Sequence, residues 1–264
     1  MSPYIGDLEA RTDLEPRPDL EAWQESWDRQ QEAYLPDREH RLSALLDTVE
    51  ATAGTDHPRV LDLAGGTGSI ALRLLARFPA AEVTLVDLDP VLLAIAGSSL
   101  RDRATVISAD LREDTWTRQL PHLGFDAVLT ATALHWFTPQ RLAALYHELH
   151  DLLRPGGVFV NADHMPDPAL PTLTKRLVAR AEARRTTRCA AGAAQSWGDW
   201  WARAAADPVL APLAERRQTI YPTGHSPEFT PAATWHVEAL LTAGFSEAGV
   251  LWRGGQDAAV AGLR

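Results

Sequence analysis

The sequence predicts an α/β fold in which a mostly parallel sheet is covered by helices on both faces. Two observations predict it. Short apolar runs alternate with segments of helical periodicity from about residue 59 to residue 162, and a glycine-rich turn follows the first run. Strands that alternate with helices form parallel sheets whose two faces are both covered.

The strands follow from short apolar runs bounded by glycine, proline or acidic residues. They are expected at residues 59–66, 82–87, 104–108, 125–130 and 158–162. A helix at 69–78 has apolar residues at helical spacing, and Pro79 stops it. Asp89 is a good N-cap residue and Pro90 a good first helical residue, so the next helix begins there. Thr138 and Pro139 predict another start of the same kind.

The flanking segments differ from this alternation. Residues 1–20 are polar and rich in proline, and 21–53 are expected to be helical. Residues 166–229 are helical and irregular, and an excursion of this length in a compact domain is usually functional, often a lid. A helix from Pro231 to about Gly244 returns the chain to the sheet. Two final runs, at 248–253 and 257–263, are expected to close it as an antiparallel pair.

Composition and charge narrow the function classes. The chain has 264 residues and one cysteine, Cys189, which favours a reducing, cytoplasmic setting. Its formal charge of −10 argues against nucleic-acid binding, which usually needs a basic surface. The N-terminal residues lack the pattern of a secretory signal, and no apolar run approaches the roughly 20 residues that span a bilayer. We therefore expect a small-molecule acceptor as partner, no nucleic acid and no membrane, and the sequence leaves a homodimer open.

The glycine-rich turn carries the chemistry. In DLAGGTGS, which begins at Asp62, Gly66 and Gly68 let the backbone approach a ligand closely. Asp87 ends the second strand, where doubly wound folds place an acid on ribose hydroxyls. The turn also fits a dinucleotide pattern, but a carboxylate at its mouth would repel a pyrophosphate and favour a ligand with an amino or sulfonium cation. S-adenosylmethionine has both cations and no phosphate.

The sequence resembles the class I S-adenosylmethionine-dependent methyltransferases. The resemblance rests on an ordered set of segments: VLDLAGGTGSIALRLL, VTLVDLDP, SADL, FDAVLTATALHWF, LRPGGVFV and LLTAGFSEAGVLWRGGQDAAVAGLR. It covers residues 57–165 and 230–264 and implies a Rossmann-like fold with a seven-stranded sheet. The general pattern is similar to trans-aconitate-type and natural-product methyltransferases of small molecules.

The resemblance implies a role for each residue of the turn and of the second strand end. Asp62 and the loop would hold the methionine part of S-adenosylmethionine. Ala64 stands where the family has its first glycine, and Gly66 and Gly68 are the other two. Asp87 would bind the ribose hydroxyls, with Leu88 beside the adenine.

The resemblance also assigns residues at later strand ends. Asp110 would accept from the adenine amino group, and Leu111 would pack on the ring. Thr130 and Ala131 would approach the methionine end. From the lid side, Arg38 would reach the cofactor carboxylate. The product would be S-adenosylhomocysteine.

Histidines that follow two strands are the candidate catalytic residues. His135 follows the fourth strand and His164 the fifth, so both should border the site at the carboxyl ends of the strands. A general base helps methyl transfer but is not required, because positioning supplies much of the rate. Asp163, His225 and His236 are weaker candidates for a base. No close ligand spacing supports a metal, so none is expected.

The organisation and function follow from these assignments. We expect an N-terminal arm and lid helix, a cofactor-binding core, a helical acceptor lid and a C-terminal helix with closing strands, at 1–53, 54–165, 166–229 and 230–264. The expected function is methyl transfer to a small molecule by in-line displacement. Two alternatives stay open: an NAD(P)-dependent oxidoreductase, and a cofactor-binding protein of this fold that transfers no methyl group.

Overall fold

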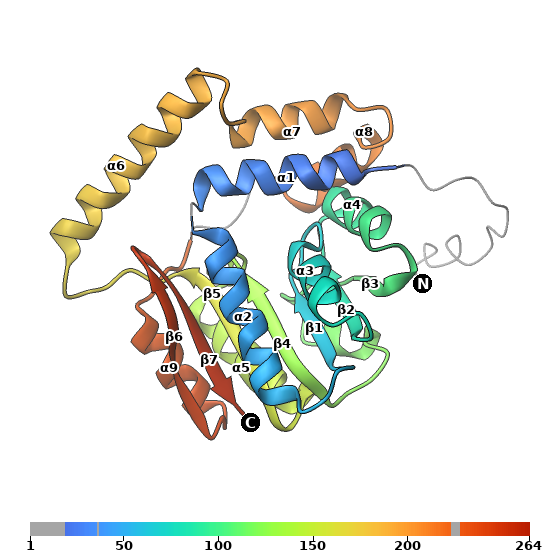
Figure 1. Ribbon diagram of the computed structural model, residues 1–264, viewed down its shortest axis with the longest axis vertical. Helices are drawn as coiled ribbons and strands as arrows, with labels where there is room; N and C mark the ends of the chain where they lie inside the picture. The colour runs from blue at the N-terminus through green and yellow to red at the C-terminus, as the bar shows by residue number, and fades with distance from the viewer. Residues whose placement is uncertain (1–18, 36, 223–227) are drawn as a thin grey trace, which may run out of the picture.

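A computed structural model describes residues 19–35, 37–222 and 228–264 of the chain (Figure 1). Its core is a seven-stranded sheet with the strand order β3-β2-β1-β4-β5-β7-β6. The strands are β1 (Arg59–Leu63), β2 (Glu82–Asp87), β3 (Ala104–Ser108), β4 (Phe125–Ala131), β5 (Leu153–His164), β6 (Glu247–Gly254) and β7 (Asp257–Leu263). The first five are parallel, and β7 is antiparallel to both β5 and β6. The predicted fold class is therefore confirmed.

Helices cover both faces of the sheet (Figure 1). One face carries α2 (Arg38–Ala53), α3 (Ser69–Arg77) and α4 (Pro90–Leu100), and the other carries α5 (Pro139–Leu152) and α9 (Ala233–Thr242). Each face buries its own apolar cluster: Leu61 and Val128 belong to the α5 side, and Val60 and Leu129 to the α2 side. Neighbouring residues of a strand thus point to opposite faces, as the pleat of a strand requires.

Local sequence signals explain where the central helices begin. The Asp89 carboxylate accepts hydrogen bonds from the backbone N–H groups of Val91 and Leu92, and Pro90 occupies the first turn of α4. The Thr138 hydroxyl accepts in the same way from the N–H of Arg141 at the start of α5. Both predicted helix starts are confirmed.

The N-terminal helical region differs from its prediction in one respect. The stretch expected as helical over 21–53 forms two helices, α1 (Glu21–Tyr34) and α2. The sequence has Pro36 between them, and proline lacks the N–H that continues a helix. The change of direction matters for function, because it separates a helix that crosses the strand ends from one that packs on the sheet.

Four helices lie outside the sheet layers. α1, α7 (Trp197–Ala206) and α8 (Ala211–Ile220) cross the carboxyl ends of the strands, and we call these three helices the roof (Figure 1). α6 (Pro171–Ala190) links β5 to the roof and has no buried residue. No helix within the described ranges has the length and apolar character to cross a membrane.

Tryptophans hold the roof together. Trp200 is fully buried, and its ring lies 5.4 Å from Trp23 and 4.9 Å from Trp27, measured between ring centroids. Its indole N–H also donates to the Ser26 hydroxyl at 3.0 Å. Two further tryptophans, Trp197 and Trp201, pack on the same group. The cluster joins α1 to α7, although 162 or more residues separate the helices in sequence.

Candidate active site

The glycine-rich turn after β1 contains three residues with a left-handed backbone conformation. Gly66 and Gly68 have φ of +56° and +84°, and Ala64 has φ of +51°. Ala64 stands at the family's first glycine and adopts the conformation that glycine adopts without steric cost. A Cβ added at Gly66 would meet only the Leu92 side chain, at 3.7 Å, so the space above the turn is open.

Asp62 lies beneath this turn and is fully buried. Its Oδ2 accepts a hydrogen bond from the N–H of Ala71 in α3 at 3.0 Å, whereas Oδ1 has no hydrogen-bond partner in the described part of the protein. Burial raises the pKa of Asp62 to about 7 against the effect of the Ala71 N–H, and the charge of Asp87 adds to the rise. Gly65 has no predicted role, but a Cβ there would lie 2.7 Å from Cγ of Asp62.

Asp87 connects the turn to the end of β2. Its Oδ2 accepts from the N–H of Gly66 at 2.8 Å, and its Oδ1 accepts from the N–H groups of Leu88 and Asp89. Burial raises the pKa of Asp87 to about 6, although these N–H groups act in the opposite direction. Asp87 thus fixes the turn, and its half-buried carboxylate is at the position predicted for the ribose contact.

Asp110, the next predicted residue of the cofactor site, forms an ion pair with Arg112. Both carboxylate oxygens of Asp110 accept from the Arg112 guanidinium, at 2.6 to 3.0 Å, and this pairing holds the pKa of Asp110 below its usual value despite burial. Leu111 is buried in the core cluster on the α5 side of the sheet. The assigned contacts of Asp110 and Leu111 with adenine stay predictions.

The end of β4 contains two features of a ligand site. Thr130 is fully buried, and its hydroxyl has no hydrogen-bond partner in the residues described. Ala131 follows at the strand end, and Thr132 then has φ of +52°. A β-branched residue rarely adopts this backbone conformation, and such strain is concentrated at functional sites. Thr132 is not among the predicted site residues, because a backbone angle of this kind leaves no signal in the composition.

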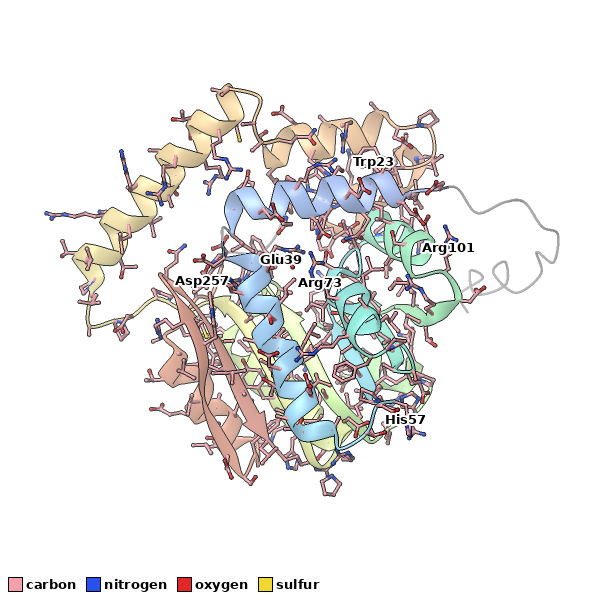
Figure 2. The ribbon with its side chains drawn as sticks, in the orientation of Figure 1. Trp23, Glu39, His57, Arg73, Arg101 and Asp257 are labelled. Atoms are coloured by element: carbon pink, nitrogen blue, oxygen red, sulfur yellow. The ribbon has the colours of Figure 1, made fainter. Side chains whose placement is uncertain are left out.

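Arg38 lies beside the start of α3, but with a partner from the chain. Its guanidinium is 2.8 Å from the Asp28 carboxylate, which also accepts from the Ser69 hydroxyl at 2.7 Å. Arg73 and Glu39 complete this group beneath α1 (Figure 2). Asp28 therefore links the roof to the first turn of α3, and the predicted contact of Arg38 with the cofactor carboxylate stays a prediction.

The roof also contacts the end of β2 from α8. Nε of Arg217 donates to the Asp89 carboxylate at 2.5 Å, and the same guanidinium lies 3.9 Å from the ring centroid of Trp201. Burial raises the pKa of Tyr221, and the charges of Asp87 and Asp89 add to this rise. Arg217 and Tyr221 come from the predicted insertion, and no local motif distinguished them.

The two predicted histidines come together at the ends of β4 and β5. Nδ1 of His135 is 2.7 Å from Oδ1 of Asp163, and the ring centroids of His135 and His164 are 5.4 Å apart. Asp163 is buried, which acts to raise its pKa, but the hydrogen bond and charge of His135 hold the pKa below its usual value. Asp163 also accepts from the backbone N–H of His135 at 3.1 Å. This buried His–Asp pair is the arrangement used by general bases.

The weaker histidine candidates are placed elsewhere. His236 is buried against α5, where its Nδ1 lies 2.7 Å from the Tyr146 hydroxyl, and burial lowers its pKa to about 4. His225 lies outside the described residues. Within the described ranges, no three His, Cys, Asp or Glu side chains are grouped to hold a metal ion.

The turn and the buried oxygens fit S-adenosylmethionine. A buried acceptor without a partner costs about 1–3 kcal/mol, and Asp62 leaves one carboxylate oxygen in this state. A ligand with an ammonium or sulfonium group would neutralise that carboxylate, whereas a pyrophosphate would be repelled. The open space above Gly66 allows the ligand to approach the backbone.

Comparison with known proteins agrees with this fit. Residues 60–157 match a family model described as a methyltransferase domain. Demethylmenaquinone methyltransferase of Thermus thermophilus is 38% identical over 110 residues, which are 42% of this chain and 49% of the relative. A tRNA1(Val) (adenine(37)-N6)-methyltransferase of Porphyromonas gingivalis is 29% identical over 152 residues, or 49% of this chain and 60% of the relative. The chain thus spans about half the length of the curated relatives it matches, and their names give different acceptors.

Solved structures extend the likeness beyond the matched domain. The DhpI–SAM–HEP complex is 18% identical, with a TM-score of 0.54, and the match covers 95% of this chain and 100% of that one. At this identity the likeness shows the fold. Residues 60–157 thus match the methyltransferase domain family, and the sheet topology and ordered strand-end motifs show the fold of the class I S-adenosylmethionine-dependent methyltransferases.

Proposed function

We propose that this protein transfers a methyl group to a small-molecule acceptor and that His135 takes a proton from a hydroxyl group of that acceptor. The observation that carries the proposal is the buried pair of His135 and Asp163 at the strand ends. A hydroxyl is a weak nucleophile until it loses its proton, so a base favours methylation of the oxygen or of a carbon conjugated to it.

Asp163 sets the state in which His135 can act. Its carboxylate accepts from Nδ1 of the ring, so the proton of the neutral imidazole is placed on Nδ1 and the lone pair on Nε2. No described residue hydrogen-bonds that Nε2. The His135 side chain is only 7% exposed, which limits competition from water for the proton-accepting atom.

The remaining residues of the site bind and orient. When bound, S-adenosylmethionine supplies a methyl group activated by its sulfonium. Asp62 and the backbone of the turn would hold its methionine part, and Asp87 its ribose hydroxyls. The roof would exclude water and keep the acceptor in line, because Asp28 and Arg217 connect it to α3 and to the end of β2.

Several observations favour this function over its alternatives. The family match supports methyl transfer over an NAD(P)-dependent oxidoreductase. The formal charge of −10 supports a small acceptor over RNA, and the single cysteine supports a cytoplasmic location. A fold of this family can also bind the cofactor without transferring a methyl group, and only turnover separates the two.

Calorimetry followed by turnover tests the proposal. We expect S-adenosylhomocysteine to bind and NAD to give no heat of binding. With S-adenosylmethionine and a panel of phenols and hydroxy acids, we expect acceptor-dependent release of S-adenosylhomocysteine. Binding of NAD alone would contradict the proposal at its first step, and cofactor binding with no methylated product from any hydroxylated acceptor would contradict the second.

A further inference from the structure

A second histidine–carboxylate pair lies beside the proposed base. His164 ends β5 and Asp257 begins β7, and the antiparallel register places these two residues opposite each other. Nδ1 of His164 is 2.6 Å from Oδ1 of Asp257, and the other oxygen of Asp257 accepts from the Arg41 guanidinium of α2. His164 is a predicted site residue, whereas Asp257 and Arg41, which hold it, are not.

The two histidines face different surroundings. The His164 side chain is 29% exposed, whereas that of His135 is 7% exposed, and their ring planes are inclined by 46°. Asp163 lies between them, since one of its oxygens accepts from the His135 ring and from the backbone N–H of His164. Neither Nε2 atom has a hydrogen-bond partner among the residues described. Each Nε2 atom can therefore still form a hydrogen bond to a ligand.

The charges around His164 favour the imidazolium form. The carboxylate of Asp257 and, more weakly, that of Asp163 raise the pKa of His164 above its ordinary value, whereas burial and the Arg41 charge oppose the rise. Arg41 is only 2% exposed, and Asp257 is its one described ion-pair partner. Arg41 thereby fixes the position of Asp257, which in turn holds the His164 ring and favours its protonated form.

We propose, on the basis of the function proposed above, that His164 binds an anionic oxygen of the acceptor next to the hydroxyl that His135 deprotonates. Asp257 and Arg41 are then positioning residues for His164. The acceptor class is a small hydroxy acid or a hydroxyl flanked by another acidic oxygen. Two rings with centroids 5.4 Å apart can contact two oxygens of such a molecule at once. A charge-assisted hydrogen bond of this kind is shorter and stronger than a neutral one.

A purely structural role would have a different signature. His164, Asp257 and Arg41 also tie β5, β7 and α2 together, so replacing any of them is expected to lower stability. A structural role predicts equal losses for charged and neutral acceptor mimics. A binding role predicts a loss confined to mimics that carry the anionic oxygen.

The test uses the full chain saturated with S-adenosylhomocysteine and two probes, salicylate and phenol. Both carry a hydroxyl on a ring, and only salicylate adds a carboxylate beside it. Histidine-ring NMR signals should shift at His135 and His164 with salicylate. The H164Q variant should weaken salicylate binding about tenfold or more, as expected for the loss of one charged hydrogen bond, and leave phenol binding within about twofold.

Control variants separate charge from geometry. His57→Gln removes another histidine beside an aspartate, at 2.8 Å from Asp56 and at the opposite end of the sheet (Figure 2), and should change nothing. Asp257→Asn should lower the pKa of His164 in an NMR titration. Because Asp257→Asn leaves the buried charge of Arg41 unpaired, the double variant with Arg41→Met tests the same point if the single variant does not fold.

The outcomes distinguish this inference from the proposed function. Failure of S-adenosylhomocysteine to bind would refute the proposed function. Cofactor binding with no shift of the His164 signal at saturating salicylate, or equal losses of salicylate and phenol in H164Q, would overturn the inference alone.

Discussion

Two pairs of carboxylates at the edge of the sheet differ in their hydrogen-bond partners and in the pKa shifts that follow. Asp62 and Asp87 form the first half of the edge, and Asp163 and Asp257 form the second. At the ends of β1 and β2, Asp62 and Asp87 accept only from backbone N–H groups among the residues described, and burial raises their pKa values to about 7 and about 6. At the ends of β5 and β7, Asp163 and Asp257 accept from imidazole nitrogens, and the pKa of Asp163 is held below its usual value.

The two pairs of carboxylates therefore differ in whether the chain supplies a charged partner. No Arg, Lys or His side chain of the described ranges forms an ion pair with Asp62 or Asp87, so under the proposed function a ligand would supply their remaining partners. The second half supplies its own cations and can hold or accept a proton without a ligand. Cofactor binding and acid–base chemistry should therefore respond separately to mutation and to pH.

The largest effect is expected on the acid–base side. His135→Gln should lower turnover by about 10²–10⁴-fold, the usual contribution of a general base, while S-adenosylhomocysteine affinity changes less than about twofold. Asp163→Asn should act in the same direction because it removes the group that orients the ring. Steady-state kinetics with calorimetry measure both quantities. A parallel loss of cofactor affinity would show that the two halves are not separate.

Gly66→Val should give the converse result. A β-branched residue is strained at φ of +56°, and its side chain would enter the space above the turn, so S-adenosylhomocysteine affinity should fall by more than about 100-fold. The matched control is Gly54→Val, which has φ of +66° and no neighbour within 4 Å at the end of α2. This control should lose stability and keep its affinity. Equal affinity losses in calorimetry would contradict a local role for the turn.

Asp87→Ala should weaken cofactor binding to an intermediate extent. Hydrogen bonds to a charged acceptor contribute about 1.5–3 kcal/mol, which corresponds to about 10- to 150-fold in the dissociation constant. Asp126→Ala is the control. Like Asp87, Asp126 accepts a hydrogen bond from a backbone N–H group, but it lies at the start of β4, where it also pairs with Arg154. Unchanged affinity in a folded Asp87→Ala variant would show that Asp87 does not bind the ribose.

The pH dependence of S-adenosylmethionine binding tests whether Asp62 faces the cation of the ligand. Because Asp62 has a pKa of about 7 and must be ionised to bind a cation, affinity for S-adenosylmethionine should rise about tenfold between about pH 6 and pH 8. Asp62→Asn should abolish most of this rise, and the remainder should follow Asp87 near its pKa of about 6. A pH-independent affinity in the wild-type protein would show that Asp62 does not face the cation.

The raised pKa of Asp62 also determines how the stability of the cofactor-free protein changes with pH. The folded state keeps a proton on Asp62 that the unfolded chain releases near pH 4, so the free energy of unfolding should fall as pH rises from about 4 to about 7. Denaturant titrations of the wild type and of Asp62→Asn at both ends of this window measure the difference.

The smallest effect is expected at Ala64. Glycine adopts a φ of +51° without the roughly 1–2 kcal/mol penalty of a side chain, but it loses more entropy on folding. Ala64→Gly should therefore raise the free energy of unfolding by at most about 1 kcal/mol and leave affinity within about twofold. Ala51→Gly, at an exposed helical position in α2, should lower it by roughly 0.5–1 kcal/mol. Destabilisation by Ala64→Gly would contradict the strain at this turn.

The sheet and the glycine-rich turn could be predicted from the sequence alone. Alternating strands and helices, N-caps such as Asp89 and the turn at Gly66 are set by residues a few positions apart. Asp62, Asp87 and Asp110 were placed at one edge because successive parallel strands must end together. These features depend on local conformation and on one topological rule, so they can be predicted from sequence order.

The partners of His164 and the packing of the roof depend on tertiary contacts that the sequence does not reveal. Asp257 meets His164 across 93 positions and Arg41 across 216, and Arg217 meets Asp89 across 128. Trp200 is buried because α7 packs on α1. The preceding helix, α6, has no buried residue. Partners this distant in sequence leave no periodicity or spacing, because their contact depends on how separate elements pack rather than on the conformation of any one segment.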